Sequence, residues 1–253
     1  MIKKSATNHR GHSAIIAEPV SIFTHQLKKP LAVARSYLEV VLSGDLGELN
    51  DKQKEYLRDT LENINRMTGA LTMLFDVSRI DEHQYRLTIK PTDIVMLVER
   101  AIAGLSFWAN KWNTLITLHT PDTLPRVLAD QERTKDVVEN FISNAVKYRP
   151  LGEKGRVDIR LEQKGNFVMI SCADNGMGVS SRDGKKIFTK FFRSEEAVRI
   201  EPVGTGLGLY INQAVVTLSG GKIWFKTNPG GGTIFYFTLP IYKQRGRGKR
   251  SAH

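Results

Sequence analysis

The chain has 253 residues, of which 41% are hydrophobic, 8% aromatic and 25% charged. These values are typical of globular proteins and exclude a fibrous or wholly disordered chain. No stretch approaches the ~18 consecutive apolar residues of a membrane span, and the N-terminus lacks the apolar core of a secretory signal. The single cysteine, Cys172, cannot form an internal disulfide, which favours a reducing, cytoplasmic location.

The net charge of +11 comes mostly from the two ends of the chain. Residues 1–12 and 243–253 contain no acidic side chain, whereas the rest of the chain is close to balanced. The basic residues at the ends are Lys3, Lys4, Arg10, Lys243, Arg245, Arg247, Lys249 and Arg250. We interpret both ends as solvated, disordered tails and expect no nucleic-acid partner, because they carry no aromatic residues and form no folded basic face.

Two long helices are predicted first. Apolar residues recur at helical spacing over 13–43, and Gly44 and Gly47 then break the pattern. Asn50, with Gln53 three residues later, matches a capping box that opens a second helix ending near residue 81. The apolar stripe of this hairpin is too wide for one helix to cover, which favours a dimer with a four-helix bundle.

Strands and helices are mixed in the rest of the chain. The expected strands are 85–90, 115–119, 156–162, 167–173, 222–226 and 233–239, and the expected helices are 93–112, 131–148 and 207–218. This mixture predicts one α+β domain. The chain is therefore expected to consist of a helical-hairpin domain at 13–82 and an α+β domain at 85–241.

Four short motifs follow one another in the α+β domain. They are Asn140 with Asn144 on one helix face, Asp174-Asn175-Gly176-Met177-Gly178 after a strand, the apolar and cationic cluster Ile187–Arg193, and Gly204-Thr205-Gly206-Leu207-Gly208-Leu209 before a helix. Glycines before a helix let backbone amides approach phosphate oxygens. The glycine spacing matches neither GxxxxGK[ST] nor GxGxxG, and each motif alone also fits a plain turn or a polar bridge. Their order and spacing together carry the information.

In that order the four motifs resemble the N, G1, F and G2 boxes of the ATP-binding domain of sensor histidine kinases. Gly231-Gly232-Thr233-Ile234-Phe235 is similar to the glycine-threonine turn near the end of that domain, and the segment 23–31 is similar to the family's H box. The resemblance covers about residues 15–241. It implies a dimerising phosphoacceptor hairpin followed by an α/β-sandwich ATP-binding domain of the histidine kinase, gyrase and Hsp90 type.

The resemblance also implies roles for individual residues. His25 would accept the phosphoryl group of ATP, Asn144 with Asn140 beside it would hold Mg²⁺, and Asp174 would accept a hydrogen bond from the adenine amine. The other residues implied to bind nucleotide are Lys147 and Arg193 at the phosphates, Tyr148 near the nucleoside, Gly176, Gly178 and Thr233, with Gly204, Thr205, Gly206, Leu207, Gly208 and Leu209 anchoring a lid at 180–203. Pro30 is expected to kink its helix near His25.

Two residues depart from the family's pattern. Gln26 follows His25 where an acidic residue normally holds the imidazole. Losing a charge-assisted hydrogen bond of roughly 1.5–3 kcal/mol slows phosphoryl transfer by about 10–150-fold. Lys29 stands where a threonine or asparagine normally orients water for dephosphorylating the partner. We therefore expect a slow autokinase with little phosphatase activity.

The resemblance implies a homodimeric, ATP-dependent protein histidine kinase that phosphorylates His25 and passes the group to an aspartate of a response regulator. Gln26 and Lys29 leave open an alternative, a nucleotide-binding pseudokinase or phosphotransfer scaffold. An ATPase of the gyrase or mismatch-repair type would use a glutamate base at the position of Asn140, and Glu139 is one residue off that face. Because only a short segment precedes the first helix, the signal would arrive through a longer sensor or a partner protein.

Overall fold

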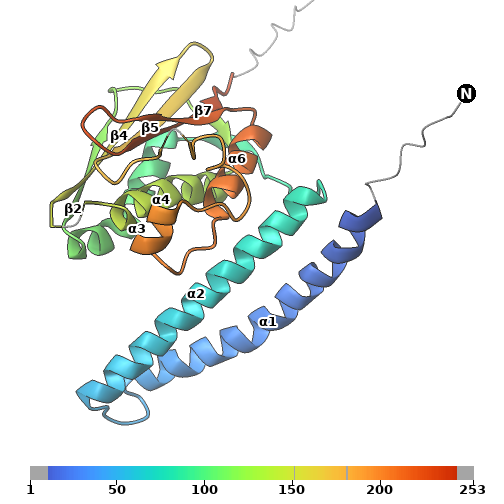
Figure 1. Ribbon diagram of the computed structural model, residues 1–253, viewed down its shortest axis with the longest axis vertical. Coiled ribbons are helices and arrows are strands. Elements are labelled where there is room, and N and C mark those ends of the chain that lie inside the picture. The colour runs from blue at the N-terminus through green and yellow to red at the C-terminus, as the bar shows by residue number, and fades with distance from the viewer. Residues whose placement is uncertain (1–10, 151, 181, 244–253) are drawn as a thin grey trace, which may run out of the picture. The chain divides into compact units, whose positions relative to one another are not determined.

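The structure, a computed structural model, describes residues 11–150, 152–180 and 182–243, with side chains from Gln26 onward (Figure 1). The chain divides into two compact units between Tyr85 and Arg86. Most of the two predicted tails, and the side chain of His25, lie outside what the structure describes. None of the helices in the described part of the chain combines the length and the hydropathy needed to cross a membrane.

The first unit is a hairpin of two long helices, α1 (Gly11–Ser43) and α2 (Asp51–Asp81). Gly44 and Gly47 turn the chain between them with φ of +88° and +120°, a region that glycine enters at little cost. The capping box is formed in both directions: the side chain of Asn50 accepts from the Gln53 N–H, and the side chain of Gln53 accepts from the Asn50 N–H, each at 2.9 Å. Both predicted helices are confirmed. Helix α1 continues through Pro30, and a kink there stays a prediction.

The apolar stripe of the hairpin is only partly covered. From Gln26 through Phe75 no side chain is fully buried, and the buried residues of α2 begin at Asp76. Several large apolar side chains are well exposed, with exposed fractions of 51% for Val33 and 54% for Met67. The helices of this unit therefore leave apolar surface exposed along their length.

The second unit is a two-layer α/β sandwich. Its elements are β1 (Lys90–Thr92), α3 (Ile94–Lys111), β2 (Thr114–His119), β3 (Val127–Ala129), α4 (Gln131–Lys147), β4 (Gly155–Lys164), β5 (Phe167–Asp174), α5 (Glu195–Ile200), α6 (Gly208–Leu218), β6 (Ile223–Thr227) and β7 (Thr233–Pro240). The main sheet has the order β2-β4-β5-β7-β6, with β2 parallel to β4 and the other neighbours antiparallel. Helices α3, α4 and α6 lie on one face of it (Figure 1). The expected fold class is confirmed.

The core lies between this sheet and α4. Alternate residues of β4, β5 and β7 are buried, as the period of two in a strand requires. Phe141 of α4 stacks on Phe235 with ring centroids 4.9 Å apart and lies 6.0 Å from Phe237. This packing fixes α4 against β7, and both elements carry residues of the candidate site described below.

The predicted strand at 85–90 is wrong. Within that range only Lys90 belongs to a strand, as the first residue of the short β1. The Tyr85 N–H donates to the carbonyl of Arg79 at 3.0 Å, and the Thr88 N–H donates to the Asp130 carboxylate at 2.7 Å. Apolar and polar residues do alternate in this segment. However, the N–H groups of Tyr85 and Thr88 bond to a helix end and to a side chain, not to a neighbouring strand. The other expected strands and helices are confirmed, whereas β3 and α5 were not predicted.

Candidate functional site

Asp174, the last residue of β5, lies at the centre of the candidate site. Its Oδ1 accepts from the Gly176 N–H at 2.8 Å and from the Thr233 N–H at 3.1 Å. Burial raises the pKa of this carboxyl, and the two backbone hydrogen bonds lower it in part. Oδ2 has no partner among the described residues, so it is the oxygen that can accept a hydrogen bond from a ligand.

The glycine turn after Asp174 packs on the end of α4. The Met177 N–H donates to the carbonyl of Tyr148 at 2.9 Å, and a Cβ on Gly176 would lie 2.5 Å from that same carbonyl oxygen. Gly178 lies beside the carbonyl of Gly232 in the β6–β7 turn. Only a residue without a side chain fits at Gly176. The close approach therefore joins the Asp174 strand end to the helix that carries the two asparagines.

Asn140 and Asn144 lie one turn apart on α4. The Nδ2 of Asn140 is buried and has no hydrogen-bond partner within the described part of the chain. A buried amide N–H without a hydrogen-bond partner costs free energy. We therefore expect a bound ligand to supply the acceptor for Asn140. The Asn144 carbonyl accepts from the Tyr148 N–H at 2.9 Å, which closes α4, and Lys147 is exposed in the last turn.

The glycine run before α6 touches the other motifs at close range. A Cβ would lie 2.7 Å from a neighbouring atom at each of three positions: at Gly204 from Cζ of Arg193, at Gly206 from the carbonyl carbon of Phe191, and at Gly208 from Nδ2 of Asn140. Helix α6 starts after Leu207 without a side-chain cap, and the positive end of its dipole favours an anion there. Thr205 accepts from the Leu207 N–H at 3.3 Å, and Leu209 is half-buried.

The guanidinium of Arg193 binds backbone carbonyls of the predicted lid. It donates to Pro202 at 3.1 Å, Gly204 at 3.2 Å and Ala197 at 2.9 Å, and also to Glu201. These bonds close the short helix α5 onto the end of the Phe191–Phe192 cluster. In this arrangement Arg193 organises the lid, so its predicted contact with phosphate requires the guanidinium to exchange partners.

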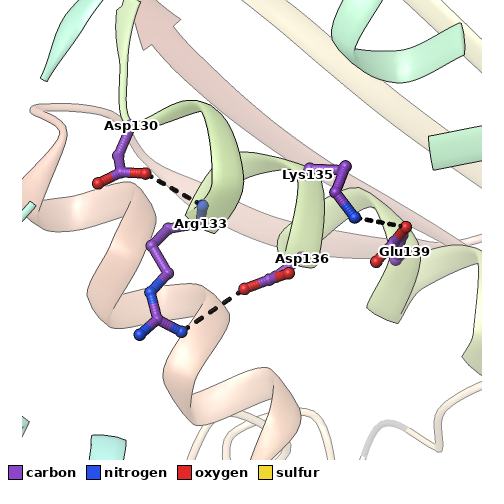
Figure 2. Close-up of polar contacts among 5 residues, drawn as sticks. All are labelled: Asp130, Arg133, Lys135, Asp136 and Glu139. Atoms are coloured by element: carbon purple, nitrogen blue, oxygen red, sulfur yellow. Dashed lines mark hydrogen bonds and ion pairs between the residues drawn. The ribbon is translucent and has the colours of Figure 1, made fainter. Parts of the chain in front are cut away.

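A capping hydrogen bond and two ion pairs lie along α4 (Figure 2). Asp130 caps the helix by accepting from the Arg133 N–H at 3.2 Å, Arg133 contacts Asp136 at 3.5 Å, and Lys135 donates to Glu139 at 2.8 Å. The hydrogen bond to Glu139 raises the pKa of Lys135. Glu139, the residue before Asn140, is thus bound by Lys135. This ion pair disfavours the use of Glu139 as a general base for water.

Position 25 lies within α1, and the residues after it are accessible. Gln26 and Lys29 are exposed. Lys28 points elsewhere: its Nζ lies 5.5 Å from the ring centroid of Phe75, and Arg79 lies over the same ring at 5.5 Å. Lys29 is therefore the exposed cation one helical turn after His25 in the sequence of α1.

The structure brings together most of the predicted nucleotide-binding residues. Asp174, Gly176, Thr233, Tyr148, Asn140, Gly208, Gly206, Gly204 and Arg193 are linked by the contacts given above. Sequence reasoning missed Asn228, whose Nδ2 donates to the Asp174 carbonyl at 2.8 Å. Its only local signal was the turn sequence Asn228-Pro229-Gly230, which indicates a bend and no partner.

This sandwich, with a carboxylate and two glycine turns against an asparagine helix, defines an ATP-binding domain of the histidine kinase, gyrase and Hsp90 class. Residues 129–243 match the family model "Histidine kinase-, DNA gyrase B-, and HSP90-like ATPase", and residues 19–83 match "His Kinase A (phospho-acceptor) domain". With both domains present in this order, the chain belongs to the sensor histidine kinase family.

Known relatives agree with this assignment. The sensor histidine kinase WalK of Bacillus subtilis (strain 168) is 33% identical over 227 residues, which cover 90% of this chain and 37% of WalK. The catalytic domain of the histidine kinase ThkA is 28% identical with a TM-score of 0.54, over 61% of this chain and 99% of that domain. Full-length ShkA, solved in complex with AMPPNP, shares the fold with a TM-score of 0.71 at 24% identity, over 90% of this chain and 46% of ShkA. The chain thus spans just over a third of the length of WalK.

Proposed function

We propose that the chain is an ATP-dependent protein histidine kinase that phosphorylates His25 and passes the phosphoryl group to an aspartate of a response regulator. The observation that carries the proposal is the convergence of Asp174, Asn140 and the glycine run on one site, with the Asn140 amide left without a partner. The complex of the related ShkA with AMPPNP supports an adenine nucleotide as the ligand.

Different residues of the site contact different parts of the nucleotide. The Oδ2 of Asp174 accepts a hydrogen bond from the adenine amine, while its Oδ1 stays with the two backbone amides. The side-chain oxygens of Asn144 and Asn140 would hold Mg²⁺, which would neutralise phosphate charge. The N-terminus of α6, which has no side-chain cap, faces the phosphates, and Lys147 adds a positive charge from the end of α4.

His25 supplies the nucleophile. Its Nε2 attacks the γ-phosphorus, an N–P bond forms, the P–O bond to ADP breaks, and the positive ring then loses its Nδ1 proton to solvent. The side-chain oxygen of Gln26 accepts a hydrogen bond from the Nδ1–H but brings no charge. The reaction is therefore slower than with a carboxylate at this position.

A second copy of the chain completes the hairpin unit. Its half-exposed apolar side chains, which include Val33, Val40 and Met67, lie on helices that one chain leaves uncovered. Pairing two hairpins buries this stripe in a four-helix bundle. Light scattering on the purified protein tests this: a mass of twice 28.5 kDa supports the dimer, and a monomer at micromolar concentration contradicts it.

Labelling with γ-labelled ATP and Mg²⁺ tests the kinase activity itself. Wild type is expected to take up acid-labile, base-stable label, and Asn144→Ala is expected to lose it. If wild type binds ATP and takes up no label, the pseudokinase or scaffold alternative, which the uncharged Gln26 favours, replaces the kinase. A response regulator as the phosphoryl acceptor and a cytoplasmic location stay predictions from the sequence.

A further inference from the structure

The turn between β6 and β7 is built around Asn228. Its N–H donates to the Gly232 carbonyl at 3.1 Å, and its own carbonyl accepts from the Gly231 N–H at 3.0 Å. Pro229 follows, which restricts residue 228 to an extended backbone. These constraints fix the direction in which the Asn228 side chain leaves the turn.

The side chain of Asn228 reaches the residue that recognises the ligand. Its Nδ2 donates at 2.8 Å to the backbone carbonyl of Asp174, 54 positions earlier in the chain. The β5–β7 ladder has ended by then, because its last pair is Ala173 with Ile234. Asp174 still pairs with Val157 of β4, and on its β7 side the amide of Asn228 takes the place of the next ladder bond.

The same turn also sets the Asp174 carboxyl. The Thr233 N–H donates to its Oδ1, and Gly232 packs so closely on Asp174 that a Cβ there would overlap both the carbonyl and Oδ1. The backbone of Asp174 is thus held by Asn228 and its side chain by Thr233. Moving the turn moves the carboxyl.

We propose that Asn228 is a positioning residue that gives the site its preference for adenine over guanine. The proposal rests on the nucleotide-binding function proposed above. A carboxylate oxygen attracts the amine on C6 of adenine and repels the carbonyl on C6 of guanine. This discrimination works only while Oδ2 is held in one place, because a carboxyl free to turn avoids the guanine oxygen.

Isothermal titration of the full chain with ADP, GDP and tripolyphosphate tests the proposal. Asn228→Ala is expected to weaken ADP binding about fivefold to tenfold, the worth of one hydrogen bond, and to reduce the ADP-to-GDP ratio of affinities. Asn228→Asp is expected to lose more, since it sets a carboxylate against the Asp174 carbonyl. Tripolyphosphate, which has no base, should bind both variants as it binds wild type.

The matched control is Asn166→Ala, in the hairpin at the opposite end of β5. It should leave all three affinities unchanged. If both Asn228 variants keep the wild-type ADP-to-GDP ratio while tripolyphosphate binding or thermal stability falls, Asn228 is merely structural and the proposal is wrong. If wild type binds no ADP, the proposed nucleotide-binding function fails, and the proposal fails with it.

Discussion

Gly208 lies directly against the side-chain amide of Asn140, so that a Cβ at position 208 would be 2.7 Å from Nδ2 and 2.9 Å from Oδ1. The first residue of α6 therefore packs against the middle of α4, with the backbone of Gly208 in contact with the side-chain amide of Asn140. This contact ties the glycine run to the helix that carries the proposed magnesium ligands.

Gly208→Ala tests that contact. The added methyl group must displace the Asn140 amide, and a shift of about 1 Å at a reacting centre costs about 100-fold in rate. We expect autophosphorylation to fall by about that factor with the thermal unfolding temperature little changed. Gly104→Ala in α3, where a Cβ makes only an ordinary contact at 3.5 Å, is the control and should keep wild-type activity. Equal activity of the two variants would contradict the prediction.

Asp174→Asn separates binding from stability. The asparagine Oδ1 can accept the same N–H groups of Gly176 and Thr233, so the fold should remain intact. Its Nδ2 would meet the adenine amine, donor against donor, and ADP affinity should fall about 10–150-fold. Asp158→Asn, on the exposed side of β4 beside His119, should bind ADP as wild type does. An unchanged ADP affinity in Asp174→Asn would show that Asp174 does not contact the base.

The raised pKa of Asp174 predicts that both ADP affinity and stability depend on pH. Burial raises the pKa of Asp174 above the ordinary value of about 3.9. Protonation then weakens adenine binding, so ADP affinity should fall as pH drops through this raised pKa. The folded chain holds the proton more tightly than the unfolded chain, so the contribution of Asp174 to stability falls as pH rises through the same window. Asp174→Asn should remove both effects in titrations and in thermal unfolding measured from the ordinary carboxyl range toward neutral pH.

Gln26→Glu is expected to speed autophosphorylation. The carboxylate restores a charged acceptor for the imidazole, and the gain is about 10–150-fold if that hydrogen bond is worth roughly 1.5–3 kcal/mol. Initial rates of label uptake at saturating ATP measure it. Gln26→Ala should be slower than wild type, because it removes the acceptor altogether. If Gln26→Glu is no faster than wild type, the missing charge at position 26 does not limit the rate of phosphoryl transfer.

Lys29→Thr is expected to raise phosphatase activity. An exposed lysine cannot orient a water molecule as a hydroxyl does, and Lys29 holds that position on α1. The measurement is the loss of label from a receiver domain that has accepted phosphate from His25, after ATP is removed. Lys28→Ala changes the neighbouring lysine, which lies over Phe75, and serves as the control. Equal rates of loss with wild type and Lys29→Thr would contradict the expectation.

Arg193→Ala should loosen the lid. The guanidinium donates to carbonyls of Ala197, Glu201, Pro202 and Gly204, and no other side chain type makes this set of bonds. Hydrogen exchange of the amides at 195–204 should become faster, and Arg193→Lys should not restore protection. Lys185→Ala, an exposed cation nearby in sequence, should leave exchange unchanged. Unaltered protection in Arg193→Ala would show that these bonds do not hold the segment.

The sequence predicted the long elements well, because their signals are local. Periodicity and the Asn50–Gln53 capping box are read within one segment. The alternation at 85–90 misled, because whether an extended segment forms a strand depends on a distant partner, and here Thr88 bonds to Asp130. The short β3 and α5 carry too few residues for a period to appear.

The site was predictable as a set of residues but not as a geometry. The order of the motifs pointed to Asn140, Asp174 and the glycine run. The contact of Asn228 with Asp174 joins residues 54 positions apart, and no local pattern announces it. An arginine in this motif suggested a contact with phosphate. In the structure the guanidinium of Arg193 instead donates to backbone carbonyls of the following segment. Such partners are set by the fold.

ATP held by this site is expected to phosphorylate His25. Tandem mass spectrometry at neutral pH, after incubation with ATP and Mg²⁺, locates the phosphoryl group. We predict one phosphoryl group on the peptide that contains His25, absent in His25→Ala and in Asn144→Ala. A phosphoryl group on another residue, or one that persists in Asn144→Ala, would contradict the account.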